Sequence, residues 1–230
     1  LVPEGSVLPP GIEAQQVPGT LQASAAIAER EVHLVPENSV LAAMLDCAHR
    51  ERGNFDRIIN LNHDYLPVFA TGLFEGKLWH IPNLTNSDAA TDQLIVQRYA
   101  EHGGRFAAIS NFQAGRLGLT GAPVLWFGMN AHPAGPSPGD DAPIFWSGRI
   151  TPEKGLEAAA SVAAAAGRNL VVAGHIENQA YFADVMKDHG DTIDHRGFLT
   201  IGELLKLCSK ACATLQTQSW EEALGLTTIE

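Results

Sequence analysis

Two cations lie close together in a segment that leaves a predicted strand and enters a predicted helix. The segment runs from Ser147 to Gly155, and Arg149 and Lys154 are five positions apart within it. Free N–H groups at a helix start attract anions, and nearby cations add charge-assisted hydrogen bonds. The segment therefore predicts a site for a diphosphate-sized anion. By spacing alone, an equally good interpretation is that both cations are solvated and that Lys154 pairs with a neighbouring glutamate.

A second segment, from Trp220 to Glu230, also follows a predicted strand. Glu222 and Glu230 are eight positions apart, and Gly225 and Leu226 lie between them. Glycine lets a ligand approach the backbone closely, and carboxylates accept hydrogen bonds from ligand hydroxyls. This pattern predicts a site for a sugar or a phosphate. The alternative is that the glutamates only stabilise a helix start on a solvated face.

Short apolar runs alternate with amphipathic stretches, which predicts βα units around largely parallel sheets. The expected strands are 32–35, 57–61, 106–109, 124–127, 144–146, 170–173, 192–195 and 213–216. The expected helices are 39–52, 88–102, a short one after Ser110, 152–166, 178–188 and 201–211. Prolines make the first 30 residues a predicted loop with at most one edge strand. Because ligands bind beyond the carboxyl ends of parallel strands, both charged segments would face a ligand there.

Composition and charge exclude several classes of protein. The 15 basic and 26 acidic residues give a net charge of -11, which disfavours nucleic-acid binding. The cysteines, Cys47, Cys208 and Cys212, form no disulfide framework and no CxxC zinc motif. No apolar run approaches the roughly 18 residues of a transmembrane segment, and no signal peptide is evident. We therefore expect a cytoplasmic protein.

No metal and no cofactor are expected. Asp140 and Asp141 are adjacent acids, but they lie in a predicted linker and no third ligand is suitably spaced. His63 and Asp64 are adjacent as well, and neighbouring residues of a strand point to opposite faces, so a catalytic dyad is not expected. The GxxxxGK[ST] and GxGxxG nucleotide motifs are missing from the sequence.

Taken together, SGRITPEKG and the later E-x7-E element with Gly-Leu inside it resemble the donor-binding half of glycosyltransferase family 4, the retaining GT-B enzymes. Further segments are similar to the family's strand ends and occur in the same order. They are 59–63, 108–110, 127–130, 171–174, and 196–199 followed by 203–205. The resemblance covers roughly residues 55–230.

The resemblance implies an α/β, GT-B-like fold with two doubly wound Rossmann-like domains facing a cleft. Residues 1–132 would form the acceptor-side domain, 133–142 the linker, and 143–230 the donor-binding domain. The family's glycine-rich loop after the first strand is not visible, and the chain ends before the family's last strands and C-terminal helix. We therefore expect a fragment with both domains incomplete, which on its own turns over poorly.

The resemblance also implies the function and the site. It predicts a retaining, metal-independent transferase that moves a sugar from a nucleotide-diphosphate sugar to a small-molecule, glycan or lipid acceptor. Arg149 and Lys154 would stabilise the leaving diphosphate, Glu222 would bind the transferred sugar, and His63 would face that sugar from the other domain. The remaining implied donor contacts are Gly148 and Gly174 at strand ends, Phe198 and Leu199 beside the base, the amides of Gly225 and Leu226, and Glu230 at the ribose.

Two alternatives to transfer stay open. One is a non-catalytic module that holds a nucleotide sugar, and the other is a GT-B relative such as a nucleotide-sugar epimerase. The sequence leaves the base, the sugar and the acceptor open. For a lipid acceptor, a peripheral position at a membrane is compatible with the family, although no basic amphipathic helix is evident.

Overall fold

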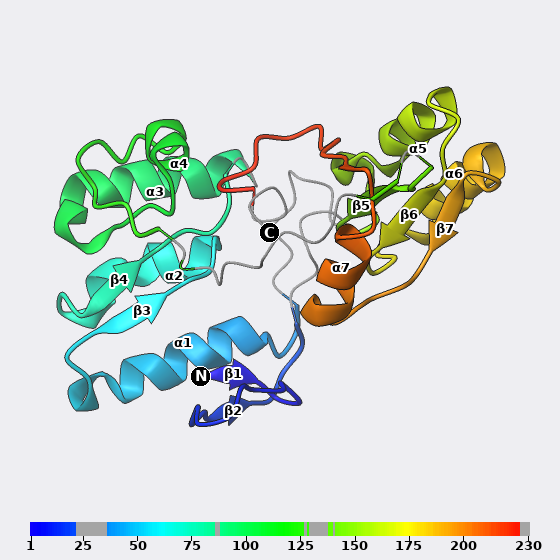
Figure 1. The fold of residues 1–230 in the computed structure, drawn as a ribbon. Coiled ribbons are helices and arrows are strands. Elements are labelled where there is room, and N and C mark those ends of the chain that lie inside the picture. Colours follow the sequence, from blue (N-terminus) through cyan, green and yellow to red (C-terminus); the bar gives the residue numbers. More distant parts are fainter. Residues whose placement is uncertain (22–35, 86–87, 127, 129–137, 140, 226–230) are drawn as a thin grey trace. The chain divides into compact units, whose positions relative to one another are not determined.

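The structure is a computed structural model, and it describes residues 1–21, 36–85, 88–126, 128, 138–139 and 141–225. The chain divides into two compact units, residues 1–127 and 128–230 (Figure 1). Each unit is a mixed α/β structure with parallel strand pairing, which confirms the predicted fold class. The strand predicted at 32–35 and most of the linker predicted at 133–142 lie outside the described residues.

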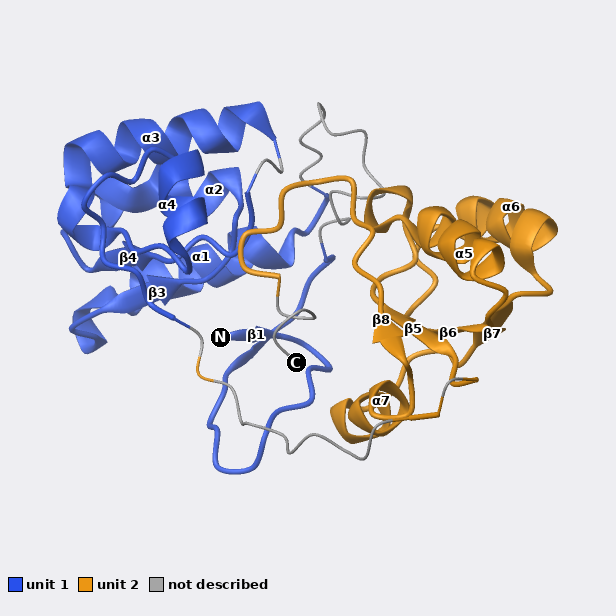
Figure 2. Ribbon diagram, turned by 45° about the horizontal axis from the view of Figure 1, so that its top comes forward, with its two compact units in different colours: residues 1–127 blue, residues 128–230 orange. Residues whose placement is uncertain are grey.

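The second unit contains a four-stranded parallel sheet in the order β7-β6-β5-β8. Helices α5 and α6 cover one face of the sheet, and α7 lies on the other face (Figure 2). The strands are β5 (Ile144–Ser147), β6 (Leu170–Ala173), β7 (Ile193–His195) and β8 (Ala213–Thr214). The helices are the 3-10 turn η4 (Pro152–Lys154), α5 (Leu156–Ala165), α6 (Gln179–His189) and α7 (Ile201–Cys208).

The core of the second unit explains why β5 and β6 are central. Their side chains are apolar on both faces, as parallel strands covered by helices require, and Ile144, Trp146, Leu170 and Val172 are all buried. Helix α5 packs its small buried alanines against this layer. Every strand and helix predicted after residue 143 is present, with ends that differ by a few residues.

The first unit contains two small parallel sheets. Strand β1 (Val2–Pro3) pairs with β2 (Gln16–Val17), and β3 (Ile58–Asn60) pairs with β4 (Leu78–His80). Single bridges extend the second sheet through 106–108 and 124, where longer strands were predicted. The helices are α1 (Val40–Arg50), η1 (Arg52–Asn54), α2 (Tyr65–Phe69), η2 (Ala70–Phe74), α3 (Ala89–His102), η3 (Gly103–Arg105) and α4 (Asn111–Arg116).

The prediction for the first residues was wrong in one respect, because two short strands pair there. Val2 donates its N–H to Gln15 and Glu4 donates to Val17, whereas Pro3, between them, faces away from the partner strand. The N–H that proline lacks is therefore not needed in this ladder.

Helix α2 and strand β4 were not predicted. Pro67 lies at the third position of α2, where a helix needs no N–H donor, so a residue that suggests a break is compatible with the helix. Strand β4 has only three residues, too few to show a period. Helix starts were easier to predict, because Ser39, Asp88 and Asn178 each cap a helix through their side chains.

His80 of β4 is buried and forms hydrogen bonds with residues of β3 and η2. Asn60 of β3 donates its side-chain N–H to Nδ1 of His80 at 3.1 Å, so this nitrogen is unprotonated. The Nε2 atom of His80 then donates to the Thr71 hydroxyl at 3.0 Å, and that hydroxyl donates to the carbonyl of Val68. Burial, followed by the nearby charges of Arg105 and His102, lowers the pKa of His80 from 6.5 to about 4.

We expect the first unit to lose stability as the pH falls from 7 to 5. Between pH 6.5 and about 4 the unfolded chain binds a proton that folded His80 does not, so stability is present above the unfolded pKa and falls with decreasing pH. The expected loss from this group is about 2 kcal/mol. Urea denaturation at both pH values measures it, and the His80→Gln variant should lose about 2 kcal/mol less than the wild type. An equal pH dependence in the two proteins would contradict this role.

Candidate functional site

Three loops of the second unit meet at the carboxyl edge of its sheet. Gly148 follows β5 and donates its N–H to the carbonyl of Ala173, and Gly174 follows β6 and donates to Gly197 at 2.8 Å. Gly174 has φ 155°, and a Cβ atom built on it would overlap the Gly148 carbonyl. The predicted glycines therefore serve close backbone packing, which brings the loops after β5, β6 and β7 together.

Arg149 lies in the loop after β5 and contacts two acidic side chains. Its guanidinium pairs with Glu177, which follows β6, and its Nη2 lies 3.7 Å from Oε1 of Glu153. The Arg149 side chain is 41% exposed, so a ligand can reach it. The cation thus lies at the strand ends as predicted, and carboxylates neutralise it.

Lys154 and Glu222, which were predicted from separate segments, contact each other directly. The ammonium of Lys154 forms an ion pair with Oε1 of Glu222. Trp220 donates its indole N–H to the same oxygen at 2.7 Å, and the Lys154 ammonium lies 4.8 Å from the centroid of a Trp220 ring. The structure therefore joins the two segments into one site. The carboxylate that neutralises Lys154 belongs to Glu222, which is 68 residues away in the sequence.

Main-chain contacts fix these two segments relative to each other. Ser219 donates its N–H to the carbonyl of Glu153 at 2.8 Å, and the Thr217 hydroxyl donates to the carbonyl of Gly155 at 2.8 Å. Gly155 has φ 73°, and a Cβ atom on it would overlap the carbonyl of Thr217. Trp220 and Thr217 were not predicted as residues of this site. The signal for Trp220 was its place two residues before Glu222.

Three more of the predicted donor residues, Phe198, Leu199 and Gly225, lie in the described part of the chain. Phe198 follows β7, and its side chain is 82% exposed. Leu199 lies beside it and is half-buried, and Gly225 follows Glu222 with a left-handed backbone. Leu226 and Glu230 lie outside the described residues. The roles of all these residues stay predictions.

His63 belongs to the first unit and is buried there. Its Nε2 atom lies 2.9 Å from Oδ1 of Asp92 in α3, and its Nδ1 atom has no hydrogen-bond partner among the described residues. A carboxylate only accepts hydrogen bonds, so Nε2 carries a proton. His63 and Asp64 lie in a loop after β3 and not within a strand. The expectation that neighbouring strand residues point to opposite faces therefore does not apply to them. The carboxylate that contacts His63 belongs to Asp92, which is 29 residues away in the sequence.

We expect Asp92→Ala to destabilise the first unit by about 1–3 kcal/mol, because it leaves Nε2 of the buried His63 without a partner. The control is Asp46→Ala, which removes the exposed pair of Asp46 with Arg50 and should change the stability by less than about 1 kcal/mol. Urea denaturation of both variants measures the difference. Equal effects would show that the His63 contact adds nothing beyond a surface pair.

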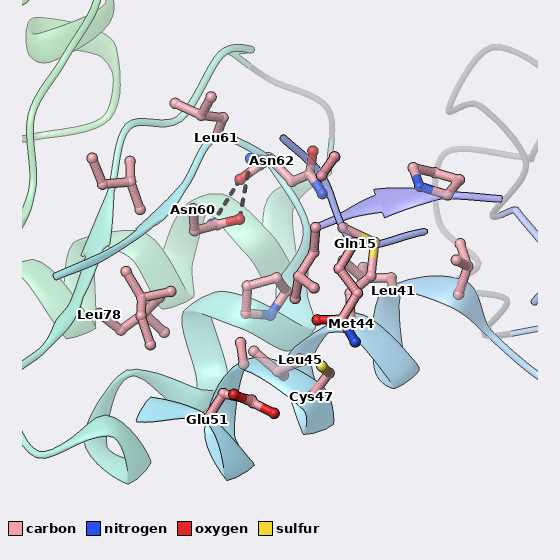
Figure 3. Close-up of a pocket in the computed structure, with 18 of the residues that line it drawn as sticks. Gln15, Leu41, Met44, Leu45, Cys47, Glu51, Asn60, Leu61, Asn62 and Leu78 are labelled. Atoms are coloured by element: carbon pink, nitrogen blue, oxygen red, sulfur yellow. Dashed lines mark hydrogen bonds between the residues drawn. The ribbon is translucent and has the colours of Figure 1, made fainter. Parts of the chain in front are cut away.

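A cavity of about 840 Å³ lies along α1 and β3 of the first unit (Figure 3). Leu41, Met44 and Leu45 of α1 line it, and the side chains of Asn60 and Asn62 lie at another wall. Several large exposed apolar side chains also line it, namely Leu1, Leu21, Phe55, Ile59 and Leu61. No predicted donor residue lines this cavity, so it was not foreseen from the sequence.

The described residues contain neither a metal-binding cluster nor a membrane-spanning helix. No group of three or more His, Cys, Asp and Glu side chains in this part of the chain is arranged to hold a metal ion. Among the same residues, no helix has the length and apolar character that crossing a membrane requires.

Solved structures with a similar fold include the following three. TarM matches with a TM-score of 0.63 and 12% identity, over 84% of this chain and 42% of that chain. The pneumococcal O-GlcNAc transferase GtfA, solved with UDP and GlcNAc, matches at 0.54 and 10%, over the same shares. A point mutant of S. aureus TarM, in complex with Fondaparinux, alpha-GlcNAc-glycerol and UDP, matches at 0.53 and 13%, over 66% of this chain and 34% of that chain.

These likenesses show that the chain has a glycosyltransferase fold, and at such low identity they show the fold alone. The chain spans less than half the length of each of these structures. No protein-family model matches the sequence, and no curated protein matches it either.

Proposed function

We propose that the chain belongs to a retaining glycosyltransferase of the family 4 type, and that its second unit binds the nucleotide-diphosphate sugar donor. The observation that carries the proposal is the contact between Lys154 and Glu222 at the carboxyl edge of a parallel sheet. This contact joins a cation suited to a diphosphate with a carboxylate suited to sugar hydroxyls. The glycosyltransferase fold supports the same function.

The chemistry of glycosyl transfer gives each charged group a task. When the bond between sugar and phosphate breaks, negative charge grows on the diphosphate and positive charge grows on the sugar ring. Arg149 and Lys154, fixed at strand ends, would stabilise the negative charge as it develops. Glu222 would accept a hydrogen bond from a sugar hydroxyl and favour the cationic ring. The proposal requires neither a metal ion nor a cofactor.

The other residues of the site would then shape the donor pocket. The close packing of Gly148 and Gly174 would let the donor approach the main chain, and Phe198 and Leu199 would border the base. Gly225, Leu226 and Glu230 would contact the sugar, the phosphate and the ribose. The acceptor would be a small molecule, a glycan or a lipid, and a lipid acceptor would place the protein peripherally at a membrane.

Product analysis tests this function against its alternatives. The intact enzyme, with both domains complete, is incubated with UDP-, GDP- and ADP-sugars, beginning with UDP-N-acetylglucosamine because UDP and GlcNAc accompany one of the similar structures. NMR then follows the sugar. Transfer to an acceptor or to water, with the configuration at the anomeric carbon retained, is the expected result. An isomerised donor would favour an epimerase, and binding without any turnover across a broad acceptor panel would favour a non-catalytic module.

A further inference from the structure

The two opposite charges of the proposed donor site, on Lys154 and Glu222, neutralise each other in the structure. The side chains of Lys154 and Glu222 are only 20% and 25% exposed. Their pair is therefore screened less by water than an ordinary surface pair. A diphosphate that binds Lys154 has to compete with the carboxylate of Glu222.

Trp220 contacts both partners through different parts of its side chain. Its ring lies near the ammonium of Lys154, and its indole N–H holds the carboxylate of Glu222. The attraction between a cation and an aromatic ring does not depend on the carboxylate. Lys154 would therefore keep one favourable contact after Glu222 has moved away.

The backbone holds Lys154 and Trp220 in place without help from the ion pair. The main-chain bond from Ser219 to Glu153 and the hydroxyl bond from Thr217 to Gly155 join their segments next to both residues. Loss of the carboxylate contact would leave these bonds intact. The exchange therefore requires only the side chain of Glu222 to move.

We propose that Glu222 is the resident counter-ion of Lys154, that the diphosphate of a ligand displaces it, and that Trp220 is the positioning residue of this exchange. The inference rests on the proposed donor site. Once displaced, Glu222 is available to the hydroxyls of the sugar. A free nucleoside diphosphate lacks the transferred sugar, so it offers Glu222 no hydroxyls of that sugar to replace the lost ion pair. The intact donor carries this sugar and does offer them. The exchange therefore makes the site select nucleotide sugars over nucleoside diphosphates.

Inorganic pyrophosphate tests the exchange without any assumption about base or sugar. Isothermal titration of the 230-residue chain compares the wild type with Glu222→Gln, which keeps the shape of the side chain but removes its charge. We expect the variant to bind pyrophosphate about fivefold more tightly, the effect of losing a competing ion pair worth about 1 kcal/mol. The control is Asp188→Asn, which removes one negative charge near the end of α6, at the opposite edge of the sheet, and should leave the affinity unchanged.

Two substitutions of Trp220 separate positioning from folding. Trp220→Phe keeps a ring beside Lys154 but loses the N–H that holds Glu222, so pyrophosphate should bind about twofold more tightly. Trp220→Leu loses both contacts and should bind pyrophosphate more weakly than the wild type. A purely structural role would weaken binding in both variants. In the wild type, the indole N–H signal of Trp220 in 15N spectra should also shift on addition of pyrophosphate. In Glu222→Gln without pyrophosphate, the same signal should differ from that of the wild type.

The outcomes distinguish this inference from the proposed function. If the wild type and Glu222→Gln bind pyrophosphate equally, or if Glu222→Gln binds it more weakly, the exchange is refuted and the donor site stands. If neither protein binds pyrophosphate and the wild type binds no nucleotide sugar, both proposals fail. If only Glu222→Gln binds pyrophosphate, the ion pair with Glu222 prevents binding in the wild type, which supports the counter-ion role.

Discussion

Replacing Gly155 with alanine should destabilise the second unit by about 3 kcal/mol or more. Gly155 has a left-handed backbone, which costs alanine about 1–2 kcal/mol. In addition, the new Cβ atom would overlap the carbonyl of Thr217, so the segment after β8 has to move. Because Thr217 and Ser219 join the two charged segments, this movement should also separate Lys154 from Glu222. Urea denaturation measures the loss of stability.

The matched control for this prediction is Gly202→Ala. Gly202 lies in α7, and nothing lies within 4 Å of the position of its Cβ atom. Alanine there should stabilise the protein by about 0.5–1 kcal/mol, because it lowers the entropy of the unfolded chain and favours the helix. If the two variants change stability by similar amounts, the close packing of Gly155 against Thr217 does not hold the site together.

Removing the ammonium of Lys154 should weaken donor binding by about 100-fold. A hydrogen bond between charged groups contributes roughly 1.5–3 kcal/mol, and its loss leaves Glu222 as an uncompensated negative charge beside the diphosphate. The affinity of Lys154→Ala for the preferred nucleotide sugar, measured by titration calorimetry, gives the size of the effect. The double variant Lys154→Ala with Glu222→Gln should recover part of the affinity for the nucleoside diphosphate.

Lys187→Ala is the control for the Lys154 variant. Lys187 is an exposed cation in the last turn of α6, away from the carboxyl edge of the sheet, so its loss changes the net charge by the same amount. Its affinity for the donor should stay within about twofold of the wild type at physiological salt. An equal loss in both variants would mean that Lys154 acts only through long-range charge.

The fold was largely predictable where local signals agreed with the tertiary structure. In the second unit, the predicted strands 144–146 and 170–173 are short apolar runs. Pro152 begins the 3-10 turn η4 and Gly167 follows the end of α5, as expected for helix boundaries, whereas Thr151 forms no side-chain cap. In the first unit such signals are weaker. Strand β4 is short, and Pro67 lies inside a helix. These elements depend on burial against neighbours distant in sequence, which periodicity does not reveal.

The contacts within the candidate site could not be predicted from the sequence. The position of Arg149, Lys154 and Glu222 after predicted strands, together with the family resemblance, selected them as candidates. The last two are 68 residues apart in sequence, and their direct pairing depends on the adjacency of β5 and β8 in the sheet. The partners of His63 and Arg149, namely Asp92 and Glu177, were likewise invisible, because single acidic residues carry no signal of which cation they will meet.

We propose above that the second unit binds a nucleotide-diphosphate sugar through Arg149, Lys154 and Glu222. The most direct test is the thermal unfolding midpoint of the chain with UDP-, GDP- and ADP-sugars, because a ligand that binds only the folded state raises it. At 100 times the dissociation constant the gain is about 2.7 kcal/mol, or roughly 5–10 °C. We predict such a rise with the sugars of one base and its loss in Arg149→Ala. A cooperative transition that none of the nucleotide sugars shifts would contradict the claim.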